Sequence, residues 1–402
     1  MVKVLNVVLS NRIGGPQIRV LSVAKELRKY GIETIMLSPK EKGDFAQRAR
    51  NENFKAYQIA LYGPRRSLLL NLKLLFTFPL TVFAIVKIIN RENIDIVHVN
   101  GLLSFHAPIA ALLTKKKVVW HLISSLYPKT LVSLLMPFIR IMADQIVVIA
   151  KKLGEYYMGS QTKLAKTHAQ IIYECVDGDK FNLFTVSKND IDKMKKEFNI
   201  NHCEKVVGCI GNINPIKGYE YYIESASLIK KEIDDVKFLI IGDILDPQKN
   251  YYCKKLINLI GSLKMGQDII FAGKRDEMPQ ILSLFDVFFL TSINEGTPLV
   301  ILEAMAMEKP VVATDVGGIS EQVADGETGI IVPPRNSKAI AEAVIYLLEH
   351  ADERIRMGKK ARERAKEMFS LERCVEEHRK LYENVQRASL LNKLIEFVYK
   401  RL

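Results

Sequence analysis

The sequence predicts an α/β protein with two doubly wound parallel sheets, and three observations support this fold class. Short β-branched runs alternate with helical stretches along most of the chain, which is typical of parallel βα units. The alternation pauses at a polar stretch, Asp177–Asp190, and then restarts. The chain has 402 residues, more than one hydrophobic core usually supports. We therefore expect two Rossmann-like domains.

Residues 1–180 are expected to form the first domain. An apolar run predicts a strand at Lys3–Leu9, and a glycine-containing loop and a helix at Gln17–Tyr30 follow it. Gly31 stands where a helix-ending glycine is commonly found. Four β-branched runs predict the other strands of this half: Glu33–Leu37, Ile94–Val99, Lys117–Trp120 and Gln145–Ile149.

Residues 181–368 are expected to form the second domain, with six strands joined by five crossovers. The predicted strands are Val206–Ile210, Lys237–Ile241, Ile269–Phe271, Val287–Leu290, Pro310–Ala313 and Gly329–Val332. Helices between them include Tyr219–Lys231, Lys249–Leu263, Pro298–Met307 and Ser337–Leu348.

The tail, residues 369–402, is predicted to be helical and free of strands. Its apolar residues Leu390, Leu394, Phe397 and Val398 have helical spacing, so one face must be buried. We expect this tail to pack on the N-terminal domain.

The stretch Ser67–Ile89 is apolar enough to resemble a membrane span. Lys73, Pro79 and Lys87 interrupt it, and a buried-strand pattern follows at once, so a span is not expected. Two interpretations stay open. The helix could partly face lipid headgroups, preceded by Arg65 and Arg66, or it could be buried against the sheet.

Charge is distributed unevenly. Residues 1–180 hold 26 Lys and Arg against 12 Asp and Glu, whereas the remainder holds 32 against 33. This asymmetry indicates an anionic partner for the first half: nucleic acid, a phospholipid surface or a phosphorylated substrate. Five scattered cysteines without disulfide or zinc spacing, and no visible signal peptide, favour a cytoplasmic location.

The segment Thr291–Gly318 carries the strongest chemical signal. A strand is predicted to end at Leu290, at the sheet edge where open α/β folds bind ligands. Thr297 is then expected as the N-cap of a helix and Pro298 as its first residue. The free amides of Leu299 and Val300 would offer a phosphate site at the positive helix end.

Two glutamates flank this predicted anion site. Glu295 precedes the helix and Glu303 lies a turn and a half inside it. A carboxylate can accept two hydrogen bonds from a vicinal diol, so the pair suits a ligand with hydroxyls on both sides of a diphosphate. A nucleotide sugar is such a ligand. The alternative is that Glu295 only caps the helix and Glu303 is a surface residue.

The pattern Glu295-Gly296-x-Pro298 with Glu303, then Pro310-Val-Val-Ala-Thr and Gly317-Gly318, resembles the retaining glycosyltransferases of family 4. The resemblance implies the GT-B fold, in which two Rossmann-like domains face an interdomain cleft. It also implies that Glu295 contacts the donor sugar and that Glu303 binds the ribose hydroxyls.

The loop Gly211–Gly218 is similar to the family loop in which a lysine holds the diphosphate, a role that falls here to Lys217. A cation there would stabilise the charge of the leaving group; the alternative is an ordinary solvated lysine. The family usually has arginine where this chain has Asn212. We expect Lys217, the helix amides or Arg275 to compensate.

Two landmarks in the N-terminal half are similar to the family pattern. Gly14 and Gly15 follow the first strand, like the glycine loop that approaches the donor phosphates, although a plain turn is an equal alternative. His121 matches the histidine that faces the donor sugar, but Leu122 replaces the usual aspartate. His98 and His106 are the competing histidines.

The hinge segment Ile171–Phe181 also matches, with Glu174-Cys175 in place of the usual Asn-Gly. Its Asp177-Gly-Asp179 triplet resembles a metal-binding motif. No carboxylate or histidine cluster completes it in the sequence, so no metal and no other cofactor is expected.

The resemblance thus implies transfer of a hexosyl-type unit, with retention, from a nucleotide diphosphate sugar bound by the C-terminal domain. The basic N-terminal domain would bind a glycan or lipid-linked acceptor, as a peripheral protein on the inner face of the membrane, in polysaccharide or glycolipid assembly. A nucleotide-sugar epimerase of the same fold is one alternative. A nucleic-acid-binding protein is another, although no recognition motif supports it.

Overall fold

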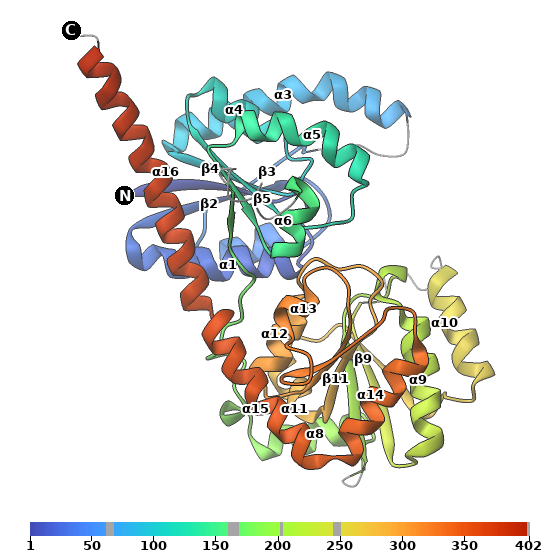
Figure 1. Cartoon of the computed structure of the whole chain (residues 1–402). Coiled ribbons are helices and arrows are strands. Elements are labelled where there is room, and N and C mark those ends of the chain that lie inside the picture. Colours follow the sequence, from blue (N-terminus) through green and yellow to red (C-terminus); the bar gives the residue numbers. More distant parts are fainter. Residues whose placement is uncertain (62–67, 160–168, 202–203, 244–250, 400–402) are drawn as a thin grey trace. The chain divides into compact units, whose positions relative to one another are not determined.

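The computed structural model describes residues 1–61, 68–159, 169–201, 204–243 and 251–399; for 68–75 and 389–399 it describes the backbone alone (Figure 1). The chain divides into two compact units. Unit 1 comprises Met1–Glu174 and Leu371–Leu402, and unit 2 comprises Cys175–Ser370. The chain thus passes between the units near residues 174 and 370, where our sequence analysis places boundaries at 180 and 368.

Unit 1 contains a seven-stranded parallel sheet with strand order β3-β2-β1-β4-β5-β6-β7. Its strands are β1 (Val2–Val7), β2 (Ile32–Pro39), β3 (Ala56–Ile59), β4 (Ile96–Asn100), β5 (Lys117–Leu122), β6 (Gln145–Val148) and β7 (Ala169–Ile171). The five predicted strands are confirmed. Two strands were not predicted, β3 and β7, which are short, half-buried and at the two edges of the sheet.

Helices cover both faces of this sheet (Figure 1). They are α1 (Gly15–Leu27), with a 3₁₀ turn η1 (Arg28–Tyr30), α2 (Phe45–Asn51), α3 (Leu68–Glu92), α4 (His106–Leu113), α5 (Lys129–Met142), α6 (Lys151–Met158) and α16 (Leu371–Tyr399). One apolar cluster lies between the sheet and α3–α6, and another lies under α1 and α2. Gly31, at φ +71°, ends the first helical segment as predicted.

The apolar stretch at 67–89 forms most of α3, and both interpretations of it hold in part. Val82, Ile85 and Ile89 are buried against the sheet. Phe76 and Leu80, in contrast, are largely exposed. Arg65 and Arg66 lie outside the described residues. Within the described part of the chain, no helix is both long and apolar enough to traverse a bilayer.

Helix α16 belongs to unit 1 and packs on α1. Its buried face is formed by residues at helical spacing: Cys374, Val375, His378, Leu381, Tyr382 and Val385. The predicted apolar positions Leu390, Leu394, Phe397 and Val398 lie where side chains are not described. Where the chain returns toward α16, Ser370 forms a bridge with Val176, so the outgoing and incoming segments run side by side.

Unit 2 contains a six-stranded parallel sheet with strand order β10-β9-β8-β11-β12-β13. Its strands are β8 (Lys205–Ile210), β9 (Val236–Ile241), β10 (Ile269–Gly273), β11 (Val287–Leu290), β12 (Val311–Thr314) and β13 (Gly329–Val332). All six predicted strands and their crossovers are confirmed, and with them the predicted fold class of two doubly wound sheets.

The helical segments of unit 2 lie between and after these strands. They are η2 (Leu183–Thr185), α8 (Lys188–Glu197), η3 (Pro215–Lys217), α9 (Tyr219–Glu232), α10 (Tyr251–Ser262), α11 (Met278–Leu284), α12 (Leu299–Ala306), α13 (Ile319–Gln322), α14 (Ser337–Glu349) and α15 (Ala351–Met368). Helix α8 begins with a capping box between Ser187 and Asp190, which explains why a polar segment starts a helix there.

Candidate active site

The sheet of unit 2 has its topological switch point between β8 and β11. The connection after β8 leads to β9, toward one edge of the sheet, and the connection after β11 leads to β12, toward the other edge. The two loops therefore diverge at this point. Open α/β sheets bind ligands at this point, beyond the carboxyl ends of the strands. The two loops with the strongest sequence signals, Gly211–Gly218 and 291–298, start at these two strands.

The structure joins Lys217 and Glu295 at this switch point. The Lys217 ammonium Nζ donates to Glu295 Oε1 over 2.6 Å, and the Ser292 hydroxyl donates to the same oxygen over 2.7 Å. The two paired side chains are only 18% and 13% exposed. A cation and a carboxylate are therefore held together in a partly desolvated place, where electrostatic interactions are stronger than in water.

Close backbone packing fixes these loops. Thr291 Oγ1 donates to the carbonyl oxygens of Lys217 and Gly218, over 3.0 and 2.9 Å. Gly218 has φ +63°, and a Cβ there would lie 2.3 Å from the Thr291 carbonyl oxygen. Gly317, at φ +58°, would bring a Cβ within 2.1 Å of the Glu295 carbonyl oxygen. Neither glycine can carry a side chain without moving the loop.

Helix α12 begins one residue later than predicted. Pro298 has an extended backbone, ψ 124°, and is the N-cap, so the first helical residue is Leu299. The predicted N-cap, Thr297, therefore stands outside the helix and is wrong in that role. Its hydroxyl is buried and has no hydrogen-bond partner among the described residues. The amides of Leu299 and Val300 still belong to the first turn, whose N–H groups have no partner inside the helix.

Glu303 lies farther along α12 and is half-buried. Burial raises the pKa of Glu303 to about 7, against the attraction of the Lys180 charge, which lowers it. In the part of the chain that the structure describes, its carboxylate forms no hydrogen bond or ion pair with another side chain. Glu303 is therefore poised to change protonation near neutral pH.

Of the remaining predicted residues in unit 2, the structure brings Gly211 to the Lys217 side chain but not Arg275. A Cβ at Gly211 would lie 3.1 Å from the Lys217 side chain. Asn212 is exposed. The Arg275 guanidinium is engaged elsewhere, in an ion pair with Glu197 of α8 and in a 3.0 Å hydrogen bond to a backbone carbonyl.

In unit 1, Gly14 and Gly15 lie at the start of α1, in the connection after β1. Gly14 is the N-cap and Gly15 the first helical residue. Here too the sheet has its switch point next to β1, between β1 and β4. The glycine loop therefore occupies in unit 1 the position that the Lys217 loop occupies in unit 2.

His121 lies near the carboxyl end of β5 and is fully buried. Its Nδ1 lies 3.2 Å from Nη1 of Arg19 and 3.2 Å from Nε2 of His98. The other ring nitrogen, Nε2, is buried without a partner in the described structure. Burial, and next the Arg19 charge, hold the pKa of His121 well below its usual value, so the ring is neutral.

The two competing histidines differ from each other. His98 joins His121 in one hydrogen-bonded group, whereas His106 packs against Phe78, with ring centroids 4.2 Å apart. Burial lowers the pKa of His106 to about 4. His106 is thus a core residue beneath α3.

Two residues of these clusters, Ser292 and Arg19, were not predicted from the sequence. Ser292 stands three residues before Glu295, a spacing that allows the observed hydrogen bond, but serines in loops are too common to single out. Arg19 gave a clearer signal. It is spaced four and eight residues from Val23 and Leu27, which are buried on α1, so a charge falls on the apolar stripe of the helix.

Two family models match the chain. Residues 13–180 match "Glycosyltransferase Family 4", and residues 190–364 match "Glycosyl transferases group 1". The chain belongs to the family 4 and group 1 glycosyltransferases. The second match contains Lys217, Glu295 and Glu303, and the first contains Gly14 and His121.

Individual relatives agree with this glycosyltransferase family. The N-acetyl-alpha-D-glucosaminyl L-malate synthase of Bacillus anthracis is 29% identical over 310 residues, covering 75% of this chain and 77% of the relative. Trehalose synthase of Thermococcus litoralis is 33% identical over 198 residues, covering 48% of this chain and 47% of the relative. The glycosyltransferase thus spans about half of that synthase.

Solved structures agree on the fold. Anabaena Alr3699/HepE, solved in complex with UDP-glucose, has a TM-score of 0.81 at 20% identity, covering 96% of this glycosyltransferase and all of that chain. Such low identity supports the fold alone. The architecture of the glycosyltransferase is accordingly GT-B.

Proposed function

We propose that this glycosyltransferase moves a hexosyl-type unit from a nucleotide diphosphate sugar to an acceptor hydroxyl with retention of configuration. The Lys217–Glu295 pair at the switch point of unit 2 carries the proposal. A cation suited to a diphosphate is paired with a carboxylate suited to sugar hydroxyls, and Glu295 stands four residues before Leu299, the first residue of α12.

The chemistry assigned to each group follows from its charge. The bond from the anomeric carbon to the diphosphate oxygen breaks, and its electron pair stays on that oxygen. Lys217 and the amides of Leu299 and Val300 stabilise this charge as it forms. Glu303, as a carboxylate, accepts hydrogen bonds from the ribose diol, and Glu295 accepts them from the sugar.

Retention requires the acceptor to attack from the face that the diphosphate leaves. In our proposal the leaving phosphate oxygen takes the proton of the acceptor hydroxyl, and that hydroxyl oxygen bonds to the anomeric carbon. No protein base is assigned to this step. No metal is assigned either, because Lys217 and the helix amides supply the positive charge.

A panel of uridine, guanosine and adenosine diphosphate sugars tests the proposal. The true donor at saturating excess should stabilise the protein by roughly 2–4 kcal/mol, read as a thermal shift. With acceptor present, NMR of the product should show retained anomeric configuration, and chelator should leave the rate unchanged. Absence of a shift with every nucleotide sugar would overturn the proposal. Release of free nucleoside diphosphate without acceptor would favour an epimerase.

We further propose that unit 1 binds the inner face of the membrane, where a lipid-linked acceptor for polysaccharide or glycolipid assembly would lie. Exposed apolar stripes on two helices that both contact α4 support this. Phe76, Leu80 and Phe83 of α3 are exposed at helical spacing, as are Phe138 and Ile141 of α5. A helix that is apolar on both its buried and its outer face is unusual in water and suits a bilayer interface.

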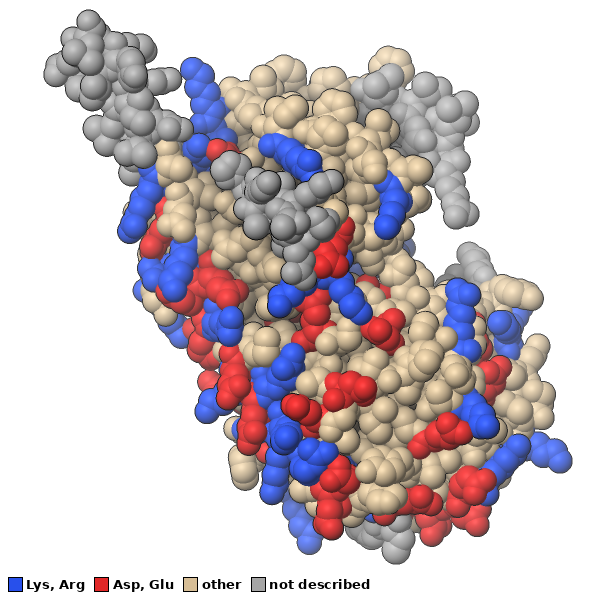
Figure 2. Space-filling model, viewed as in Figure 1, with Lys and Arg blue, Asp and Glu red and all other residues tan. Residues whose placement is uncertain are grey.

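Basic side chains accompany these apolar stripes. Lys87 of α3 and Lys129 and Arg140 of α5 are exposed. In Figure 2 the upper surface of unit 1 is mostly uncharged, with scattered blue Lys and Arg, whereas unit 2 has blue and red intermixed. Exposed apolar groups framed by cations match anionic lipid.

We expect the double substitution Phe138→Asp with Ile141→Asp to weaken binding to anionic vesicles about tenfold or more, because two apolar contacts with lipid are lost and negative charge is added. Co-sedimentation with phosphatidylglycerol-containing vesicles measures this. Ile257→Asp on α10 of unit 2, where Ile257 is 62% exposed, is the matched control. Vesicle binding that depends on neither the lipid charge nor the salt concentration would contradict the proposal.

A further inference from the structure

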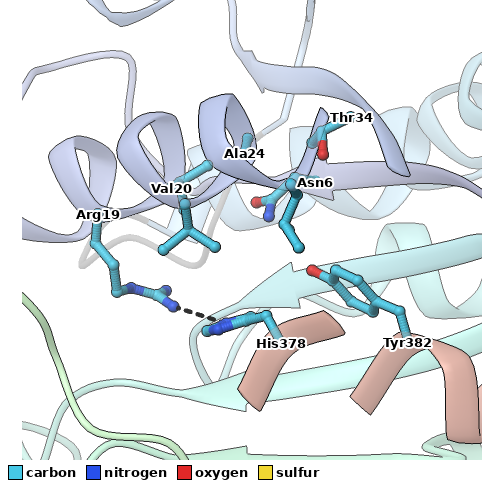
Figure 3. A pocket seen from close by; sticks show the side chains of 9 residues that line it. Asn6, Arg19, Val20, Ala24, Thr34, His378 and Tyr382 are labelled. Atoms are coloured by element: carbon cyan, nitrogen blue, oxygen red, sulfur yellow. Dashed lines mark hydrogen bonds between the residues drawn. The ribbon is translucent and has the colours of Figure 1, made fainter. Parts of the chain in front are cut away.

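Unit 1 contains a buried polar group that joins the two ends of the chain. Arg19 of α1 lies beside His378 of α16, and Tyr382 of α16 and Asn6 of β1 line the same pocket (Figure 3). His98, His121 and Asn100 from the sheet complete the group. All these residues are buried, so each hydrogen must have a definite place.

Arg19 determines where the protons lie, because arginine only donates hydrogen bonds. Nη2 donates to Asn100 Oδ1 over 2.8 Å. Nη1 faces Nδ1 of His121 at 3.2 Å and Nε2 of His378 at 3.4 Å. Both ring nitrogens must therefore present a lone pair. His378 agrees independently, since its Nδ1 donates to the Cys374 carbonyl over 2.8 Å.

A row of hydrogen bonds, here called the hydrogen-bond chain, links three side chains: Tyr382, His98 and His121. The Tyr382 hydroxyl lies 2.6 Å from Nδ1 of His98, and Nε2 of His98 lies 3.2 Å from Nδ1 of His121. Without Arg19, donation along this hydrogen-bond chain could run in either direction, because a hydroxyl and a neutral imidazole can each donate and accept. With Arg19 in place, Tyr382 donates to His98, and His98 donates to His121.

We propose that Arg19 is a positioning residue that selects the Nε2-protonated tautomer of His121, so that this histidine offers a hydrogen-bond donor to the substrate. Nδ1 of His121 accepts a hydrogen bond, so the single proton of the neutral ring sits on Nε2. That nitrogen is buried and has no partner among the described residues. A buried unpaired N–H is costly, and an oxygen of a bound sugar would satisfy it once the side chains that cover Nε2 move aside.

The identity of the accepting oxygen rests on the proposed function, whereas the tautomer does not. Glu174 is the charged group that faces Arg19 from the other side, with its Oε2 3.3 Å from Nε. Among the described residues it forms no hydrogen bond or ion pair with His121. This separation provides a matched pair of variants, because the Glu174 charge can be removed with or without the arginine.

Long-range ¹H–¹⁵N NMR of ¹⁵N-histidine-labelled protein distinguishes protonated from unprotonated ring nitrogens; His121→Asn assigns the signals. We expect wild type, Glu174→Gln and Tyr382→Phe to show His121 with the proton on Nε2. Tyr382→Phe should leave the proton on Nε2 of His121, because a hydroxyl can donate or accept and so does not determine the direction of donation. In Arg19→Met combined with Glu174→Gln both directions become possible, so part of the His121 population should carry its proton on Nδ1.

A proton on Nδ1 of His121 in the wild type, or an unchanged Nε2 proton in the Arg19→Met double variant, would overturn the proposal. The wild-type spectrum decides even if that double variant fails to fold. In transfer assays we expect the double variant to lose roughly tenfold in kcat/KM for the nucleotide sugar relative to Glu174→Gln. The spectra are recorded without substrate and therefore do not depend on the proposed function. If the proposed function is wrong, the wild type will be inactive in the transfer assay but will still show the proton on Nε2 of His121.

Discussion

Replacing Lys217 with methionine is expected to lower kcat by a factor of about 10²–10³, the usual effect of removing one preorganised group that stabilises developing charge. Methionine keeps the apolar stem that crosses Gly211, so the loop geometry should survive. Steady-state kinetics with the nucleotide sugar identified by thermal shift measures the effect.

Lys230→Met is the matched control for this substitution. Lys230 of α9 is also paired with a carboxylate, Asp268, at 3.0 Å in the same unit, and Asp268 directly precedes β10, at the edge of the sheet opposite the switch-point loops. The control substitution should leave kcat within twofold. Should Lys217→Met keep wild-type turnover, the lysine does not act on the leaving group, and its pairing with Glu295 is only structural.

Replacing Glu303 with glutamine is expected to weaken binding of the nucleotide sugar by roughly 10- to 100-fold, since hydrogen bonds to a charged group are lost. Burial raises the pKa of Glu303 to about 7, so wild-type affinity should rise as pH increases through 7 and the carboxylate forms. The variant should lack this pH dependence. Calorimetric titration at pH 6 and pH 8 measures both effects, with the exposed Glu342→Gln as control.

The same substitution should affect stability in the opposite direction. The folded-state pKa of Glu303 lies above its unfolded value, so the folded form binds the proton more tightly. Its contribution to the free energy of unfolding therefore declines as pH rises from about 4.5 through 7. Glu303→Gln should accordingly raise the melting temperature at pH 8 and not at pH 4. A lower melting temperature at pH 8 would indicate a structural role.

The sequence was sufficient for the sheets because most strands are buried on both faces and read as continuous β-branched runs. The two strands that were missed, β3 and β7, are half-buried edges with only four and three residues. Tertiary pairing, rather than local pattern, makes them strands. The N-cap of α12 was misplaced by one residue because both Thr297 and Pro298 suit helix starts.

Local motifs likewise predicted Lys217 and Glu295 separately but not their contact, which bridges 78 positions of the chain. The buried contacts of Arg19 were harder still to predict, since Arg19 and His378 are 359 positions apart in the sequence. Only two hints existed: a charge on the apolar stripe of α1, and His378 and Tyr382 on the buried stripe of α16. Spacing cannot show that two such stripes meet.

Because unit 1 includes Leu371–Leu402, it can be completed only after all of unit 2 has been synthesised. Unit 2 is contiguous, and a nascent chain exposes all of it before α16 leaves the ribosome. Until then the guanidinium of Arg19 must lack His378, and the ring of His98 must lack Tyr382. Helix α16 thus completes the polar interior around α1, and unit 1 can mature only after unit 2 has been synthesised.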